Sequence, residues 1–195
     1  MVIQPNNEEQ AMGRPSKREE RRKEILEAFA QVLANHGYAG ATIAAIAEEA
    51  GVAPGLIHHH FKGKDELLTC LLDQLVVDFR ERTRAEEGEG LPAYADAALR
   101  LRGTAGIDGA RCWVGLFAEA VRDPTLFRKM RRVLDTEVSL IQARSGGTLS
   151  AQQSSGVMAF IVGALVFGAF APTKTRGFAA PCLHEILGAF ALANE

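Results

Sequence analysis

The sequence has few cysteines and no apolar run long enough to cross a membrane. Its three cysteines, Cys70, Cys112 and Cys182, lie far apart, so a disulfide framework and a thiolate zinc site are both excluded. The most apolar segment, residues 157–171, is shorter than the roughly 20 residues that a spanning helix needs. The first 12 residues are polar and lack the apolar core of a secretory signal. We therefore expect a cytoplasmic protein without a membrane partner, whose residues 1–12 form a disordered arm.

Motifs of catalysis are also lacking. The sequence has no paired carboxylates, no glycine-rich phosphate loop and no nucleophile beside a base, so an enzyme is not expected. Three consecutive histidines, residues 58–60, do not predict a metal site. Neighbouring helical residues point about 100° apart, whereas chelation from one helix needs an i, i+4 spacing. No metal and no cofactor is expected.

Positive charge is not in excess over the whole chain. The formal net charge is −2, whereas proteins that bind nucleic acid usually carry more Lys and Arg. Residues 13–64, however, hold eight Lys and Arg against six Asp and Glu, and these cations form two clusters. The clusters are Arg14, Lys17, Arg18, Arg21, Arg22 and Lys23, and then Lys62 and Lys64. A charge cluster taken alone is more often a solvated surface, but these two flank one short segment.

Helix signals fill the segment between the two clusters. Ser16 can cap a helix that Gly37 ends. Thr42 can cap a second helix of about two turns, and Pro54 opens a third through residue 60 or 61. A tight turn at residues 51–53 joins the last two into a helix-turn-helix unit, whose second helix enters the major groove of DNA. An ordinary three-helix bundle has the same periodicity and stays open at this point.

A family resemblance favours the first interpretation. Residues 42–52 (TIAAIAEEAGV) and 55–68 (GLIHHHFKGKDELL) closely resemble the TetR family of bacterial transcriptional regulators, and the likeness covers about residues 17–68. It implies an all-α fold, with a three-helix DNA-binding head and a helical body for ligand binding and dimerisation. It also implies contacts between DNA and five residues. Thr42 and Lys64 hold phosphates, His58 and His59 touch the DNA, and Gly55 lets the backbone approach closely.

Three positions of the reading helix depart from the family pattern. Ala53 replaces the usual serine cap, Pro54 stands where lysine is common, and Leu56 where threonine is common. Fewer polar groups are then available to bases, although Pro54 and Leu56 can contact thymine methyl groups. Whether Leu56 faces DNA or packs inward stays open. Lys62 adds a cation beside the reading helix, and Arg14 is a candidate for the minor groove unless it belongs to a solvated arm.

From residue 65 onward, the apolar periodicity predicts helices and no strands. We expect helices over about residues 64–86, 92–101, 110–121, 125–144, 150–172 and 180–193, with a loop at residues 103–106. The uncharged segment 157–171 is rich in small residues, which predicts close packing inside protein. With the last helix, it resembles the pair through which the family dimerises. The predicted domains are the arm (1–12), the DNA-binding domain (13–64) and the ligand-binding and dimerisation domain (65–195).

Recognition of DNA also points to a dimer. One short helix contacts only a few base pairs, so specificity against a genome needs two symmetric half-sites. We therefore expect a homodimer on an imperfect palindromic operator of double-stranded DNA.

The body predicts a small-molecule site. Residues 111–120 (RCWVGLFAEA) and Asp123-Pro124 loosely resemble the choline-responsive branch of the family, but the likeness is too short to carry choline over. We expect an unidentified effector in an apolar pocket with one polar group. The candidate lining residues are Phe79, Tyr94, Trp113, Phe117, Glu119, Phe127 and Phe160. Ordinary core packing is the alternative for each aromatic residue.

Together these features predict a DNA-binding transcriptional regulator. We expect a repressor that leaves its operator when a ligand favours a body conformation in which the two reading helices no longer match the major grooves. The helix that joins head and body, residues 64–86, is the expected lever. A regulator that senses oxidation through a cysteine, and an activator of the same fold, are the alternatives.

Overall fold

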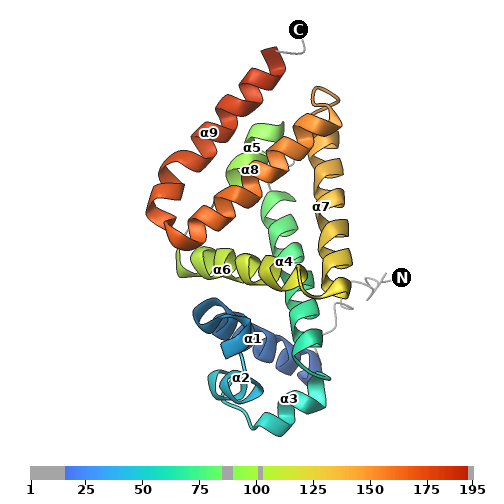
Figure 1. Ribbon diagram of the computed structural model, residues 1–195, viewed down its shortest axis with the longest axis vertical. Coiled ribbons are helices and arrows are strands. Elements are labelled where there is room, and N and C mark those ends of the chain that lie inside the picture. The colour runs from blue at the N-terminus through green and yellow to red at the C-terminus, as the bar shows by residue number, and fades with distance from the viewer. Residues whose placement is uncertain (1–15, 85–89, 101–102, 193–195) are drawn as a thin grey trace, which may run out of the picture.

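The computed structural model describes residues 16–84, 90–100 and 103–192, and these residues form nine helices and no strand (Figure 1). The helices are α1 (Lys17–Gly40), α2 (Ile43–Glu49), α3 (Pro54–His60), α4 (Lys64–Arg84), α5 (Gly90–Ala98), α6 (Gly103–Ala120), α7 (Pro124–Arg144), α8 (Ala151–Phe170) and α9 (Pro172–Leu192). The predicted all-α fold is confirmed. Helices α1–α3 form a head at one end, and α4 runs from it into the body (Figure 1). The expected arm and Arg14 lie outside the described residues.

Side-chain caps begin the helices of the head. Ser16 Oγ accepts a hydrogen bond from the Glu19 amide at 3.2 Å, and the Glu19 carboxylate accepts one from the Ser16 amide at 2.8 Å. Thr42 Oγ1 accepts from the Ala45 amide at 3.1 Å. Gly37 interrupts α1 with a φ of 67°, in the left-handed region that favours glycine. The predicted cap positions are therefore confirmed, whereas Gly37 interrupts α1 and the helix ends only at Gly40.

One hydrophobic core runs from the head into the body. Ile25 and Phe29 of α1 are fully buried in the same cluster as Leu116 of α6. The contact between α1 and α6 is the most extensive between any two described helices. A second core joins α4 and α5 to α8 and α9, around Tyr94 and Ile161. Because α6 contacts both α1 and α8, it lies between the head and the outer helices of the body.

Close approach of α6 to α1 depends on two small residues. A Cβ atom added to Gly115 would lie 3.4 Å from the Leu33 side chain, so little room is left between the helices. Cys112 is buried at the same contact, and its Sγ donates to the Ala30 carbonyl oxygen at 3.3 Å. The head is thus attached to the body through α6 as well as through α4.

Three predicted boundaries are wrong. Residues 103–106, predicted as a loop, form the start of α6, because packing against α1 and α8 outweighs the low helix propensity of glycine. Helix α9 begins at Pro172 instead of residue 180, since proline is tolerated in the first turn, and Pro181 lies inside the helix. Helix α5 covers Gly90–Ala98 instead of residues 92–101.

Helix α8 is about as long as its neighbours α7 and α9 but carries no charged residue. Ser150 caps it in a capping box with Gln153, and the helix continues for 20 residues to Phe170. By length and composition alone it could cross a membrane, which corrects the expectation drawn from the shorter segment 157–171. It packs, however, on α6, α7 and α9, and 39% of its most apolar stretch is buried. Contact with protein thus explains part of this composition, and the rest of the helix surface stays uncovered in the single chain.

Candidate nucleic-acid interface

The turn between α2 and α3 is closed by the backbone. The Val52 amide donates to the Ala47 carbonyl oxygen at 2.9 Å, and Gly51 takes a φ of 63°, which a side chain would strain. Ile46 of α2 and Ile57 of α3 are fully buried and hold the two helices on α1. These contacts fix the orientation of α3 from its inner side.

The outer side of α3 is open to solvent. Pro54, Gly55, His58 and His59 are exposed, and Leu56 is half-buried. Ala53, at the N-cap position, makes no side-chain hydrogen bond. A Cβ atom added to Gly55 would meet nothing within 4 Å, so packing within the chain does not require glycine there. The exposed face is therefore free to lie against an external partner.

Arg22, one of the clustered cations near the N-terminus, turns inward. Its Nη1 donates to the His60 carbonyl oxygen, and its Nη2 donates to Glu66 Oε1 at 3.2 Å. Its guanidinium carbon lies 4.1 Å from the centroid of the Phe61 ring. The Lys62 amide donates to Glu66 Oε2 at 2.8 Å, and this bond, with Arg22, holds the pKa of Glu66 below its usual value. One cation thus joins α1, the end of α3 and the start of α4.

Lys64 is also engaged within the chain. Its Nζ donates to the Tyr38 carbonyl oxygen at 2.6 Å and lies 4.1 Å from the centroid of the Tyr38 ring. The Tyr38 hydroxyl donates to Asp65 Oδ1 at 2.8 Å. The ammonium of Lys64 keeps further protons for a phosphate, but its position is set by the end of α1. Lys62, by contrast, is exposed.

Cations farther along α1 are partly neutralised. Arg21 pairs with Glu24 at 2.5 Å, and Lys23 lies 3.8 Å from Glu27. The positive charge that the sequence concentrates here is therefore shared with carboxylates of the same helix.

His60 is the buried member of the three histidines. Burial lowers its pKa, and the nearby charges of His59 and Arg18 act in the same direction. Its Nδ1 has no hydrogen-bond partner among the described residues. Its ring is therefore neutral near pH 7 and serves packing. Within the described ranges, no cluster of three His, Cys, Asp or Glu side chains is placed to hold a metal ion.

The body holds a narrow apolar cavity of about 20 Å³. It lies among α4, α6, α7 and α8, and it includes three of the predicted aromatic residues. The lining residues are Val76, Phe79, Trp113, Phe117, Val133, Leu134, Glu137, Met158, Val162 and Leu165. The rings of Trp113 and Phe117 lie 5.9 Å apart, centroid to centroid. No sequence pattern pointed to Glu137, which lies in a helix rich in solvent-exposed charges.

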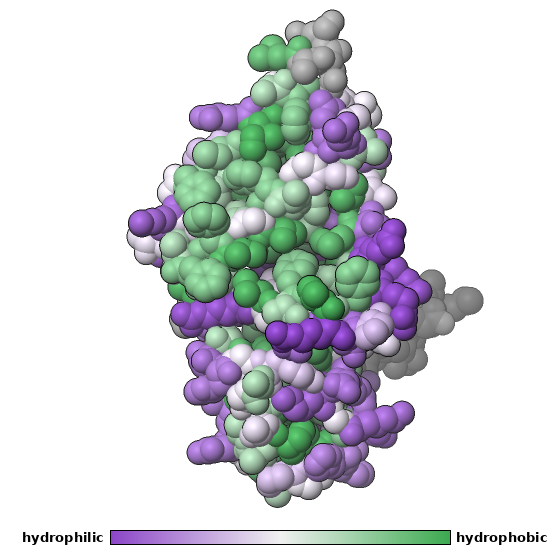
Figure 2. All heavy atoms as spheres, in the orientation of Figure 1, coloured by the Kyte–Doolittle hydropathy of each residue, from purple (hydrophilic) through white to green (hydrophobic). Residues whose placement is uncertain are grey.

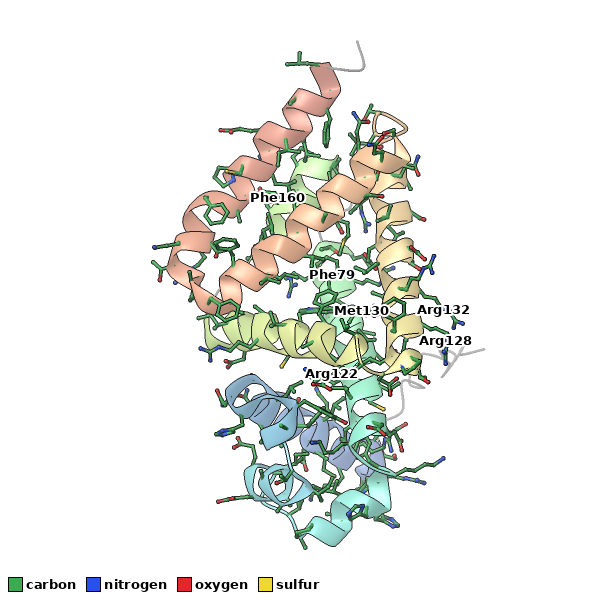
Figure 3. All side chains as sticks on the ribbon, viewed as in Figure 1. Phe79, Arg122, Arg128, Met130, Arg132 and Phe160 are labelled. Carbon is green, nitrogen blue, oxygen red and sulfur yellow. The ribbon has the colours of Figure 1, made fainter. Side chains whose placement is uncertain are left out.

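Four predicted pocket residues do not line this cavity. Tyr94 is buried beside it in the second core, where its ring meets Phe79 edge-on at 6.3 Å. Phe160 packs on the second core and lies well away from Phe79 along α8 (Figure 3). Glu119 lines a separate cleft with Tyr38, at the junction of head and body. Phe127 is 51% exposed at the start of α7.

The outer face of α8 and α9 is strongly apolar. Figure 2 shows hydrophobic side chains gathered over these two helices. Phe167 and Phe170 are 62% and 78% exposed, and the Phe167 ring meets Phe178 of α9 edge-on at 6.1 Å. Exposed apolar surface of this kind is typical of interaction sites.

A helix-turn-helix with an open outer face, on a helical body with an internal cavity, defines a DNA-binding transcriptional regulator. The family model described as bacterial regulatory proteins, tetR family, matches residues 25–70. Residues 25–70 thus match the DNA-binding domain of the TetR family, and the similarities support a TetR-family transcriptional regulator. The predicted recognition of this family from residues 42–68 is thus confirmed.

Relatives of known sequence agree with this assignment. The chain is 32% identical over 121 residues to the HTH-type transcriptional regulator BetI of Stenotrophomonas maltophilia, a match that covers 57% of this chain and only 60% of that protein. It is 29% identical over 167 residues to BetI 1 of Chromohalobacter salexigens, covering 78% and 80%. The predicted resemblance to one branch of the family is confirmed as a likeness of sequence.

Two solved structures share the fold. A transcriptional regulator from Rhodococcus sp. Rha1 superposes with a TM-score of 0.79 at 23% identity, covering 88% of this chain and 96% of that one. The multidrug binding protein EbrR, complexed with malachite green, gives a TM-score of 0.66 at 20% identity, covering 88% and 98%.

Proposed function

We propose that this regulator is a homodimeric repressor that binds a palindromic operator through α3 and is released by a small molecule in the cavity beside Trp113. The observation that carries the proposal is the rigid presentation of α3, held by Ile57 and Arg22 from within and open on its outer side. TetR regulators bind DNA, act as dimers and bind small-molecule ligands. They are soluble proteins, so we place this one in the cytoplasm.

The DNA contacts come from one surface of the head, which we take as residues 13–64. Exposed side chains of α3 face the bases, and cations beside it face the phosphates. The proposed contact residues are Arg14, Thr42, Ala53, Pro54, Gly55, Leu56, His58, His59, Lys62 and Lys64. Few of these are cations, so backbone approach at Gly55 and apolar contact at Pro54 carry much of the fit.

The dimer forms through α8 and α9, within the proposed body of residues 65–195. Exposed Phe167 and Phe170 lie where α8 is not covered by its own chain. Ala159 and Gly163 are exposed on the same helix, and small residues let two helices approach closely. The pairing buries the apolar surface that Figure 2 shows.

Ligand release uses α4 as the lever. Val76 and Phe79 of α4 line the cavity, while Lys64 begins the same helix beside α3. At about 20 Å³ the cavity is too small for an effector, so binding must move the surrounding helices. A ligand that prefers the expanded body shifts the population away from the DNA-binding spacing.

Selection of binding sites from random double-stranded DNA tests operator binding. We expect an imperfect palindrome, and we expect a His58→Ala, His59→Ala variant to lose about 1–3 kcal/mol per lost base contact by fluorescence anisotropy. His36→Ala is the matched control, since His36 is exposed on the head but lies in α1. Recovery of no preferred sequence contradicts operator binding. Deletion of the gene tests whether the protein represses or activates its target, because a fall in the target transcript indicates an activator.

The thiol-sensing alternative has little support. Burial raises the pKa of Cys112 to about 12, which keeps its thiol protonated and poorly reactive. Cys70 and Cys182 are half-buried, and all three cysteines are free.

A further inference from the structure

The cavity beside Trp113 contains a buried carboxylate. The Glu137 side chain is 3% exposed, and it is the one charged group among the described residues that line the cavity. The other lining side chains are aliphatic, aromatic or thioether groups. A carboxylate in such surroundings is stable only with a charged or hydrogen-bonding partner.

The partner in this conformation is Arg80. Its Nε donates to Glu137 Oε1 at 2.7 Å. The two partners are not equivalent, because the Arg80 side chain is 43% exposed whereas Glu137 is enclosed. Arg80 can move into water and recover its hydration there. Glu137 cannot, so it stays ionised after Arg80 leaves only if another cation takes its place, and otherwise has to take up a proton.

We propose that the effector is a small apolar organic cation that replaces Arg80 as the partner of Glu137. The inference rests on the proposed function, since it names the ligand class of that cavity. The rings of Phe79, Trp113 and Phe117 surround the site and suit an alkylammonium group, which binds aromatic faces. An anion would face the Glu137 carboxylate, and a neutral molecule would leave the Arg80 pair intact.

The exchange would also act on α4. Two ion pairs fasten α4 to α7: Arg80 to Glu137, and Asp73 to Lys129 at 2.6 Å. Lys129 Nζ also lies 3.3 Å from the Thr69 carbonyl oxygen, which strengthens the attachment nearer the head. Loss of the Arg80 pair therefore releases the body end of α4 and leaves the other attachment as a pivot. Movement about that pivot would reach α3 at the opposite end of the helix.

The chain offers its own readout of binding. Trp113 is the single tryptophan of the sequence and lines the cavity, so its fluorescence reports on occupancy without any DNA. Phenyltrimethylammonium and tert-butylbenzene are suitable probes, because they have the same shape and differ in charge.

We expect the cation to change the Trp113 fluorescence and to bind at least about tenfold more tightly than the neutral probe. Glu137→Gln should weaken cation binding by about tenfold or more and leave the neutral probe unaffected, which also shows that the variant folds. Arg80→Met removes the competitor and should tighten cation binding. Arg131→Met removes an exposed ion pair within α7, between Arg131 and Asp135, and should leave both affinities unchanged.

Equal affinity for the two probes, unchanged cation binding in Glu137→Gln, or no binding of the cation at millimolar concentration would each overturn the inference. These outcomes are separate from those of operator binding, because the assay contains no DNA. A protein that selects an operator but fails these tests loses only the proposed ligand class. One that binds the cation without any change in operator affinity keeps the cation site and contradicts ligand release.

Discussion

The guanidinium carbon of Arg22 lies 4.1 Å from the centroid of the Phe61 ring. The same guanidinium group donates hydrogen bonds to the His60 carbonyl oxygen and to Glu66. These partners come from the end of α3 and the start of α4, 38 or more residues away in sequence. Arg22 therefore adds a polar attachment to the packing of Ile57, through which α3 is also held on α1.

Replacement of Arg22 with methionine should lower the free energy of unfolding by about 2 kcal/mol. The loss follows from the missing bonds to His60 and Glu66 and from the missing contact with Phe61, and urea denaturation measures it. Lys17→Met is the control, because Lys17 is exposed at the start of α1 and should change stability by no more than about 0.5 kcal/mol. A stable Arg22→Met protein with weak DNA binding would instead make Arg22 a phosphate contact.

Acid should destabilise the head through His60. Its folded pKa is lowered by burial, so the unfolded chain takes up a proton first as the pH falls. Stability is therefore full above the usual histidine pKa of about 6.5 and declines as the pH falls below it. The free energy of unfolding, measured at pH 7.5 and at pH 5.5, should differ less between the two pH values for His60→Phe than for the wild type. His58→Gln, at an exposed position, should keep the wild-type difference, and an equal effect of both variants would argue against this origin.

The apolar outer face predicts a dimer that one charge can break. Phe167→Asp places a carboxylate at a side chain that is 62% exposed in the single chain, and sedimentation should then report a monomer at micromolar concentration. Val121→Asp is the matched control, since Val121 is 81% exposed but lies beyond α6 and away from α8 and α9. If neither variant changes the mass, the dimer forms elsewhere.

The contact between α1 and α6 predicts that stability depends on the size of the side chain at position 115. Alanine fits, because its Cβ would lie 3.4 Å from Leu33, and it should leave stability unchanged or slightly raised. Leucine would force the helices apart and should lower stability by about 1–3 kcal/mol. Thermal unfolding of the two variants separates these outcomes, and equal behaviour would mean that α6 moves freely on α1.

Local signals in the sequence predicted the head well. Caps at Ser16 and Thr42, the left-handed glycine at Gly37 and the first-turn proline at Pro54 act within a few residues of where they stand. Such features are visible in sequence because their hydrogen bonds and backbone angles are local.

Long-range pairs were not predictable in the same way. Arg22 looked like one more cation of a basic cluster, and Glu137 like one more charge of a solvated helix. Their roles depend on Glu66 and Arg80, which are 44 and 57 residues distant. Phe127 was misplaced for the related reason that periodicity does not show which helix faces a cavity. The DNA-contact residues remain predictions, because their partner is a separate molecule.

The small size of the cavity beside Trp113 has a consequence for timing. About 20 Å³ is room for roughly one water, so the proposed effector would have to wait until the helices around the cavity separate. The observed association rate then levels off at high effector concentration, at the rate of opening. The free energy of opening is subtracted from the affinity as well. A regulator built in this way ignores brief or dilute exposures and answers those that last.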